Sequence, residues 1–125
     1  MREFLFRGKR KDNGDWVYGY YEKYNDGSYI NLQTDRLNSG GYPIREFIEI
    51  IPETVGQYTG LTDKNGKKIF EGDIVKDPWR ISKVEYYRGC YYPFISFPEY
   101  SCWDTDETEV IGNVYDNPEL WKVIK

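Results

Sequence analysis

Turn-forming residues interrupt this chain at short intervals, and this spacing constrains the fold more than any other feature of the sequence. Short β-prone runs stand between the turns, and the first of them are Phe4–Arg7, Trp16–Tyr21 and Ser28–Leu32. No run sustains the 3.6-residue period of an amphipathic helix. Short strands separated by regular turns are typical of small barrels and sandwiches. The sequence therefore predicts a mainly β fold, as a single small barrel-like domain over residues 1–125 with short helical turns.

Three glycine-containing turns give the clearest local signals. Asn25–Gly27 and Asp63–Gly66 each predict a hairpin turn, because Asn, Asp and Gly tolerate a positive φ. We expect Gly66 to have a positive φ. Gly72 and Asp73 predict a tight bend that leads into a buried strand at Ile74.

Other segments predict the remaining elements. Residues 34–42 predict a flexible loop, and Ile44–Ile51 predicts a strand that ends at Pro52. A second hairpin is expected from Lys83–Tyr87 and Tyr91–Phe97, with its second strand at a sheet edge because Pro93 lacks an N–H. Val110–Tyr115 predicts the last strand, and Asn117 followed by Pro118 predicts the cap of a short helical turn.

The composition argues against most catalytic chemistry. The 125 residues include no histidine and two cysteines, so His-dependent triads and four-ligand zinc sites are excluded. We expect Cys90 and Cys102 to be reduced structural thiols, and their spacing does not show whether they lie close together. The sequence predicts no enzyme activity, no metal and no cofactor.

The same composition predicts a cytoplasmic protein. No apolar run is long enough to span a bilayer, and the charged start of the chain does not resemble a signal peptide. The net charge is −4, and acidic residues concentrate between residues 99 and 109. This acidic run is read as a solvated face.

Aromatic residues make up 18% of the chain, which suits a β-rich core and also a surface that binds a partner. Trp16, Tyr18 and Tyr20 share one face of a strand because side chains alternate. We expect this face to be the inner face of the barrel. Alternatively, it stacks the bases of single-stranded nucleic acid. In that alternative the phosphates are held by the basic N-terminal residues Arg2, Arg7, Lys9, Arg10 and Lys11. The acidic remainder of the chain predicts that such binding is weak.

Two motifs resemble a known family. Val55–Val75 resembles the central motif of the YopX family, and Val110–Leu120 resembles its C-terminal motif. Phe4–Arg7 matches the start of the family. The resemblance implies a phage or prophage protein of Gram-positive bacteria with a β-rich, barrel-like fold, and it implies no catalytic residue or cofactor.

Within these motifs, two groups of residues are candidate sites. The acids Asp63, Glu71 and Asp73 are able to hold a divalent metal if they converge, but the favoured interpretation is that they stabilise turns. If the last strand pairs beside the central motif, a polar and aromatic patch would form. Its members would be Gln57, Tyr58, Asn113 and Tyr115.

Three functions follow from these observations. The favoured one is a non-enzymatic accessory protein that binds an unknown phage or host protein, or a second copy of itself. The second is a weak binder of single-stranded nucleic acid. The third, a carboxylate metal enzyme, rests only on the three acids of the central motif.

Overall fold

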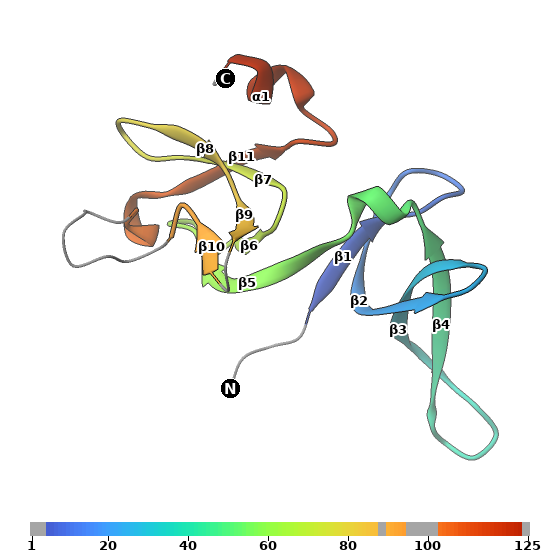
Figure 1. Ribbon diagram of the computed structural model, residues 1–125. Coiled ribbons are helices and arrows are strands. Elements are labelled where there is room, and N and C mark those ends of the chain that lie inside the picture. The colour runs from blue at the N-terminus through green and yellow to red at the C-terminus, as the bar shows by residue number, and fades with distance from the viewer. Residues whose placement is uncertain (1–4, 88–89, 95–102, 124–125) are drawn as a thin grey trace. The chain divides into compact units, whose positions relative to one another are not determined.

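The computed structural model describes residues 5–87, 90–94 and 103–123 (Figure 1). The chain divides into two compact units, Met1–Gln57 and Tyr58–Lys125. Both units consist mainly of antiparallel strands, which confirms the predicted mainly β class. The described strands form no closed barrel. The assignment of residues 1–125 to one domain stays a prediction.

The first unit is a meander of four strands in which each strand pairs with the next. The strands are β1 (Phe6–Lys9), β2 (Trp16–Tyr24), β3 (Gly27–Leu37) and β4 (Pro43–Ile50). The short 3₁₀ helix η1 (Pro52–Thr54) follows, and then β5 (Gly56–Thr62) begins. Gly56 and Gln57 pair with β1, and β5 continues into the second unit.

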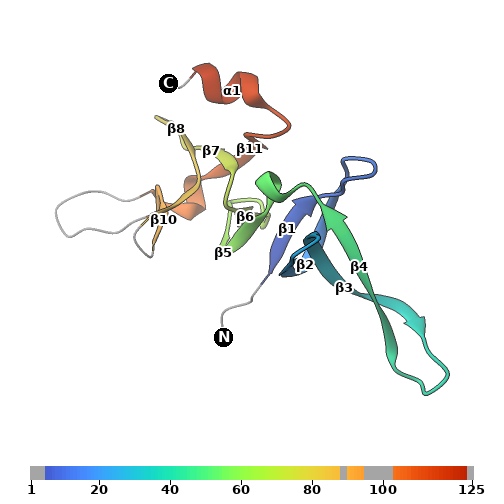
Figure 2. The same ribbon diagram turned by 45° about the vertical axis from the view of Figure 1, so that its right-hand side comes forward.

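The sheet of the first unit curls until the end of β4 returns to the residues that follow β1 (Figures 1 and 2). An isolated bridge joins Arg10 to Ile50. The N–H of Ile51 donates to the Lys9 carbonyl at 2.8 Å, and the N–H of Lys11 donates to the Glu49 carbonyl at 3.0 Å. This curl gives the sheet an inner face and an outer face.

The inner face has little room, and its side chains fit that space. Ile30 and Ile50 are completely buried. A Cβ added at Gly8 would lie 2.5 Å from the Ile50 Cδ1, and one added at Gly19 would lie 2.5 Å from the Asn31 carbonyl oxygen. Small residues on β1 and β2 therefore allow the isoleucines of β3 and β4 to fill the interior.

The predicted loop over residues 34–42 is wrong for its first half. β3 extends to Leu37, which pairs with Pro43 beyond an irregularity in the β3–β4 register. The Thr34 hydroxyl supports this stretch by donating to the Ile44 carbonyl at 2.6 Å. The polar composition of residues 34–37 concealed the strand, because this end of the hairpin is exposed and needs no apolar alternation. The predicted strand over Ile44–Ile51 is confirmed as β4.

The second unit contains the rest of the strands in short pairs. β5 pairs with β6 (Lys68–Phe70), β7 (Asp73–Lys76) lies between β8 (Ile81–Lys83) and β11 (Glu109–Asn113), and β9 (Glu85–Tyr87) pairs with β10 (Cys90–Tyr92). The 3₁₀ helix η2 (Thr105–Glu107) precedes β11, and the helix α1 (Pro118–Val123) follows it. The core of this unit is a cluster of buried side chains: Ile69, Val75, Val84, Tyr91 and Trp103.

Most of the predicted turns of this unit are confirmed. Gly66 has φ +80°, and Gly72 has φ +94° at the bend before β7. The predicted strand Lys83–Tyr87 is divided at Val84, whose backbone bonds to Gly72 and Asp73. The expected hairpin is present as β9 and β10, whereas residues 95–97 of its predicted second strand lie outside the described residues.

The predicted helical turn is α1, and it begins at Pro118. Asn117 precedes it as expected, but its side chain accepts a hydrogen bond from the Asn113 N–H at 3.2 Å. In the described part of the chain, no helix has the length and apolarity needed to span a membrane.

Replacing Gly66 with alanine is expected to lower the free energy of unfolding by about 1 kcal/mol, because alanine tolerates a positive φ poorly. An added Cβ would meet nothing within 4 Å, so backbone strain accounts for the effect. Denaturant melts measure it. Gly40 is exposed and does not have a positive φ, so Gly40→Ala is the control variant. Equal midpoints for wild type and Gly66→Ala would contradict the expectation.

Candidate binding surface

The outer face of the first unit carries the aromatic side chains of β2. Tyr18 and Tyr20 are 47% and 57% exposed, and Trp16 is half-buried on the same side of the strand. The prediction that Trp16, Tyr18 and Tyr20 form the inner face of a barrel is therefore wrong. The other side of β2, which carries Val17 and Gly19, points to the isoleucines of the interior. Large rings occupy the outside of the curl because the inside has no room for them.

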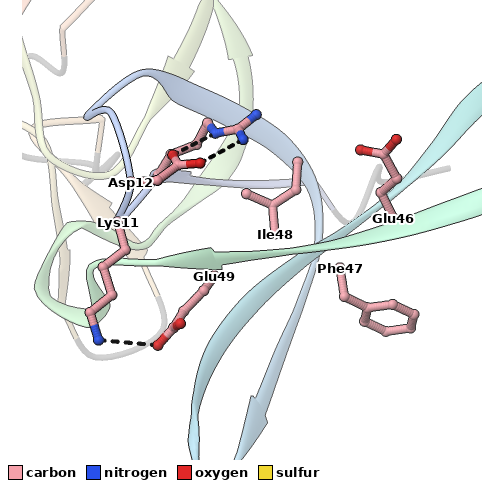
Figure 3. A pocket seen from close by; sticks show the side chains of 7 residues that line it. Lys11, Asp12, Glu46, Phe47, Ile48 and Glu49 are labelled. Atoms are coloured by element: carbon pink, nitrogen blue, oxygen red, sulfur yellow. Dashed lines mark hydrogen bonds and ion pairs between the residues drawn. The ribbon is translucent and has the colours of Figure 1, made fainter.

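Phe47 on β4 extends the aromatic surface across the sheet. Tyr20 pairs with Asn31, and Asn31 pairs with Phe47, so the three side chains share a face. Phe47 is 54% exposed. Figure 3 shows Phe47 and Glu49 on one side of β4 and Ile48 on the other. The term outer face is used below for the residues that strand pairing places on this side: Arg7, Lys9, Trp16, Tyr18, Tyr20, Glu22, Tyr24, Tyr29, Asn31, Gln33, Arg45, Phe47 and Glu49.

One end of the outer face is cationic. The Arg7 guanidinium lies 4.5 Å from the centre of the Trp16 ring, and the Lys9 ammonium lies 5.7 Å from it. On β4 the Arg45 guanidinium lies 5.6 Å from the centre of the Tyr20 ring. We call Arg7, which is only 5% exposed, Lys9 and Arg45 the cationic end. Contacts of this kind between cations and aromatic rings are attractive and restrain the rings.

The other end of the outer face is acidic and surrounds two tyrosines. The rings of Tyr24 and Tyr29 meet edge to face with centroids 5.7 Å apart. Partial burial raises the pKa of both phenols. The carboxylates of Glu22 and Asp26 raise the pKa of Tyr24 further. The carboxylates of Asp26 and Glu49 do the same for the pKa of Tyr29. We call Glu22, Asp26 and Glu49 the acidic end, and a hollow of about 420 Å³ lies beside the two rings.

Asn31 links the two ends across the middle of the face. Its Oδ1 accepts a hydrogen bond from the Arg45 Nε at 2.7 Å, and its Nδ2 donates to the Glu22 Oε2 at 3.2 Å. The amide therefore orients the guanidinium on one side and the carboxylate on the other. From the cationic end to the acidic end, the order along β4 is Arg45, Phe47 and Glu49.

The predicted basic patch of the N-terminal segment is not assembled as one surface. Arg2 lies outside the described residues. Arg10 is paired with Asp12 at 2.9 Å, and Lys11 with Glu49 at 3.2 Å (Figure 3). These pairs border a hollow of about 600 Å³ next to β4. The remaining acid of its lining, Glu46, pairs with Arg36 at 2.7 Å, so the hollow gives no indication of a charged ligand.

Residues 5–122 match the family model described as YopX protein. This chain belongs to the YopX family. A solved structure, described as the crystal structure of protein EF1440 from Enterococcus faecalis, is similar at 24% sequence identity and a TM-score of 0.59. The alignment covers 96% of this chain and 99% of that one, and the likeness shows a shared fold alone. No curated protein matches.

The YopX central motif is held by a buried carboxylate. Asp63 is 6% exposed, and its Oδ1 accepts hydrogen bonds from the N–H groups of Asn65 and Lys67, each at 2.9 Å. Its Oδ2 accepts from the N–H of Val110 at 3.0 Å. Burial opposes the charge of Asp63, but these three bonds outweigh it and lower the pKa. Asp63 therefore joins the central motif to the C-terminal motif.

The other two acids of the YopX central motif, Glu71 and Asp73, lie in different surroundings. Asp73 is 1% exposed, and its Oδ2 accepts from the Phe70 N–H at 2.8 Å at the bend before β7. Glu71 borders a different space, a hollow of about 330 Å³ that also includes Tyr115. Among the residues that the structure describes, no group of three acids, cysteines or histidines is arranged to hold a metal ion.

Strand pairing does not form the predicted patch of Gln57, Tyr58, Asn113 and Tyr115. β11 pairs with β7, so Asn113 lies opposite Asp73 rather than beside β5. Tyr58 is buried, and its ring packs against Phe70 with centroids 5.6 Å apart. The Asn113 Oδ1 accepts from the N–H groups of Tyr115 and Asp116 at 3.0 and 2.9 Å. Asn113 therefore closes the turn after β11.

One feature of the second unit was missed from the sequence. The turn Asp77–Arg80 exposes Trp79 to 76%. The Asp77 carboxylate accepts from the Trp79 N–H at 2.9 Å and from the Arg80 Nη2 at 2.8 Å. Burial raises the pKa of Asp77, but the Arg80 side chain and the backbone bonds lower it more, so the net shift is downward. An Asp-Pro-Trp-Arg tetrapeptide between two strands was the available signal.

The two cysteines and the acidic run between residues 99 and 109 lie partly outside the described residues. Cys102 and Glu99 lie outside the described residues, so the relation of Cys102 to Cys90 is not described. Within the acidic run, the Asp104 carboxylate caps η2 by accepting from the Asp106 N–H at 2.9 Å. Glu109 lies 3.6 Å from the Lys64 ammonium.

Proposed function

We propose that this chain is a non-enzymatic accessory module that binds a protein through its outer face. We further propose that a phage or prophage encodes it and that it acts in the bacterial cytoplasm. The observation that carries the proposal is the exposure of Tyr18, Tyr20 and Phe47, each near one half, on a single face. Large aromatic side chains gathered on one exposed surface are a mark of protein interaction sites.

The composition of the outer face favours a protein over other partners. Tyr, Trp, Phe and Arg are the residue types enriched at protein interfaces. The outer face exposes Lys9 and Arg45, whereas Arg7 is buried, and the acids Glu22 and Glu49 on the face match these two cations. Asp26 in the turn adds a third acid, so the face has no excess positive charge for a phosphate backbone. Its tyrosines lose little conformational entropy on binding, because they have only two side-chain torsions and neighbours already hold several of them.

Affinity capture with matched variants tests the proposal. The immobilised chain is exposed to a nuclease-treated extract of the cells that encode it. We expect a specific protein to be retained by wild type and by Trp79→Ala, which removes the most exposed of the large hydrophobic side chains whose exposure is known. The same protein should be lost from the triple variant Tyr18→Ala, Tyr20→Ala and Phe47→Ala. Retention by the triple variant would contradict the proposal.

We expect no nuclease activity from the purified chain, because Asp63 and Asp73 hold backbone N–H groups in turns. Assays with single- and double-stranded DNA in magnesium and in manganese should show no cleavage. Cleavage that is lost in Asp73→Asn but kept in Asp106→Asn would favour a carboxylate metal enzyme instead. Both variants must retain the wild-type circular dichroism for the comparison.

Single-stranded nucleic acid is the second candidate, favoured by the row of Trp16, Tyr18 and Tyr20 on the exposed side of β2. Alternate residues on a strand are about 6.7 Å apart, and such rings can stack bases. Because the net charge is −4, we expect dissociation constants no tighter than about 10⁻⁴–10⁻⁶ M. Fluorescence anisotropy with labelled oligothymidine at physiological salt measures them. Nanomolar binding that is lost on charge reversal of Arg7, Arg10 and Lys11 would reverse the ranking.

A further inference from the structure

The arrangement of charge on the outer face is complementary to itself. Along β4 the order is a cation at Arg45, an aromatic ring at Phe47 and a carboxylate at Glu49. Arg45 and Glu49 are four residues apart, a separation of about 13 Å on a strand. A two-fold rotation about an axis that lies parallel to the face, perpendicular to β4 and level with Phe47, sets one outer face against another and exchanges the cationic end with the acidic end.

We propose that the outer face is occupied by the outer face of a second copy of this chain, in a two-fold symmetric dimer. The inference rests on the proposed function, since it names the protein that this face binds. In such a dimer Lys9 and Arg45 of each copy meet the acidic end of the other, whereas Arg7, which is buried, does not touch the second copy. Tyr20 and Phe47 of the two copies meet at the axis, where large aromatic side chains contribute most to binding.

The acidic end offers a specific place for a cation of the other copy. The hollow of about 420 Å³ is bordered by Tyr24 and Tyr29, with Asp26 at its rim. A guanidinium such as that of Arg45 is attracted both by the faces of these rings and by the carboxylates. The exposed pair of Lys11 with Glu49 does not prevent this contact, because exposed ion pairs contribute little and exchange readily.

Sedimentation equilibrium over a range from about 1 to 500 µM tests the dimer. We expect a mass that rises toward twice the 14.9 kDa of one chain. Tyr20→Ala with Phe47→Ala should raise the dissociation constant at least about tenfold. Trp79→Ala, the control in the second unit, should leave it unchanged. A wild type that stays monomeric throughout, or a dimer that the double variant does not weaken, would overturn the inference.

Charge exchange between copies tests the two-fold arrangement. Arg45→Glu and Glu22→Lys should each weaken the dimer, because each places like charges together at both ends. An equimolar mixture of the two variants should associate again, since every contact between ends is then attractive. Failure of the mixture to associate would overturn the arrangement. Circular dichroism verifies folding, and Phe47→Ala alone replaces any variant that does not fold.

The results separate this inference from the proposed function. If wild type is monomeric but affinity capture still shows a protein that the Tyr18, Tyr20 and Phe47 triple variant loses, the dimer is wrong and the proposed function stands. If wild type is monomeric and the triple variant loses no captured protein, both are wrong. Association that requires added oligothymidine would indicate nucleic acid and would also overturn the dimer.

Discussion

Replacing Asp63 with alanine is expected to lower the free energy of unfolding by about 3 kcal/mol or more. The substitution removes the acceptor of three backbone N–H groups, those of Asn65, Lys67 and Val110. A hydrogen bond to a charged group contributes about 1.5–3 kcal/mol, and three such bonds are lost. Chemical denaturation at pH 7 measures the loss, and Asp104→Ala, which removes one exposed cap, is the matched control. Equal losses in the two variants would show that Asp63 does not join the two motifs.

The same carboxylate gives a test by pH. The pKa of folded Asp63 lies below its ordinary value of 3.8, so the ionised group stabilises the fold above that value. This contribution is lost as the pH falls from about 4 through the folded pKa. We therefore expect the difference in stability between wild type and Asp63→Ala to shrink over this range. A difference that stays constant down to pH 2 would contradict the role of the charge.

Replacing Gly19 with alanine is expected to destabilise the first unit by about 3 kcal/mol, near the upper limit for overpacked sites. The added Cβ would lie 2.5 Å from the Asn31 carbonyl oxygen and 3.0 Å from the Ile30 Cγ2. The nearer atom belongs to the backbone of β3, so relief requires β2 and β3 to separate. Thermal and denaturant melts provide the measurement.

The variant Gly40→Ala is the control for Gly19→Ala. Gly40→Ala places its Cβ 3.3 Å from the exposed Tyr42 ring, which can move aside. We expect a change of less than about 0.5 kcal/mol there, the usual range for surface substitutions. A loss at Gly19 no larger than that at Gly40 would show that the inner face has more room than the strand register implies.

The turns and the fold class followed from the sequence because they depend on local chemistry. Asn65 followed by Gly66 favours a tight turn through its own backbone preferences, and the φ of +80° at Gly66 agrees with that expectation. The segment from Gln33 to Leu37 was not predictable, since its strand depends on pairing with β4 and not on its own composition. The division of the chain at Gln57 is likewise a property of contacts between distant residues.

The candidate surface also depends on contacts between distant residues, so the sequence predicted it only in part. Alternation correctly placed Trp16, Tyr18 and Tyr20 on one face of β2, but alternation does not determine which face is buried. That choice depends on the glycines at positions 8 and 19, which leave space for Ile50 and Ile30. The contribution of Phe47 required the register of two further strand pairs. A small residue between large aromatic residues on a strand is the sequence signal that favours aromatics outside.

Site-specific photo-crosslinking tests most directly whether the outer face is a binding surface. A photoreactive benzoylphenylalanine is placed at Tyr20, or at the more exposed Trp79 as a control, and the chain is irradiated in the cells that produce it. We predict a discrete protein adduct from position 20, of twice the chain mass if the partner is a second copy, and no such adduct from position 79. No adduct from position 20, equal adducts from both positions, or an adduct that nuclease removes would contradict the assignment of this face to protein binding.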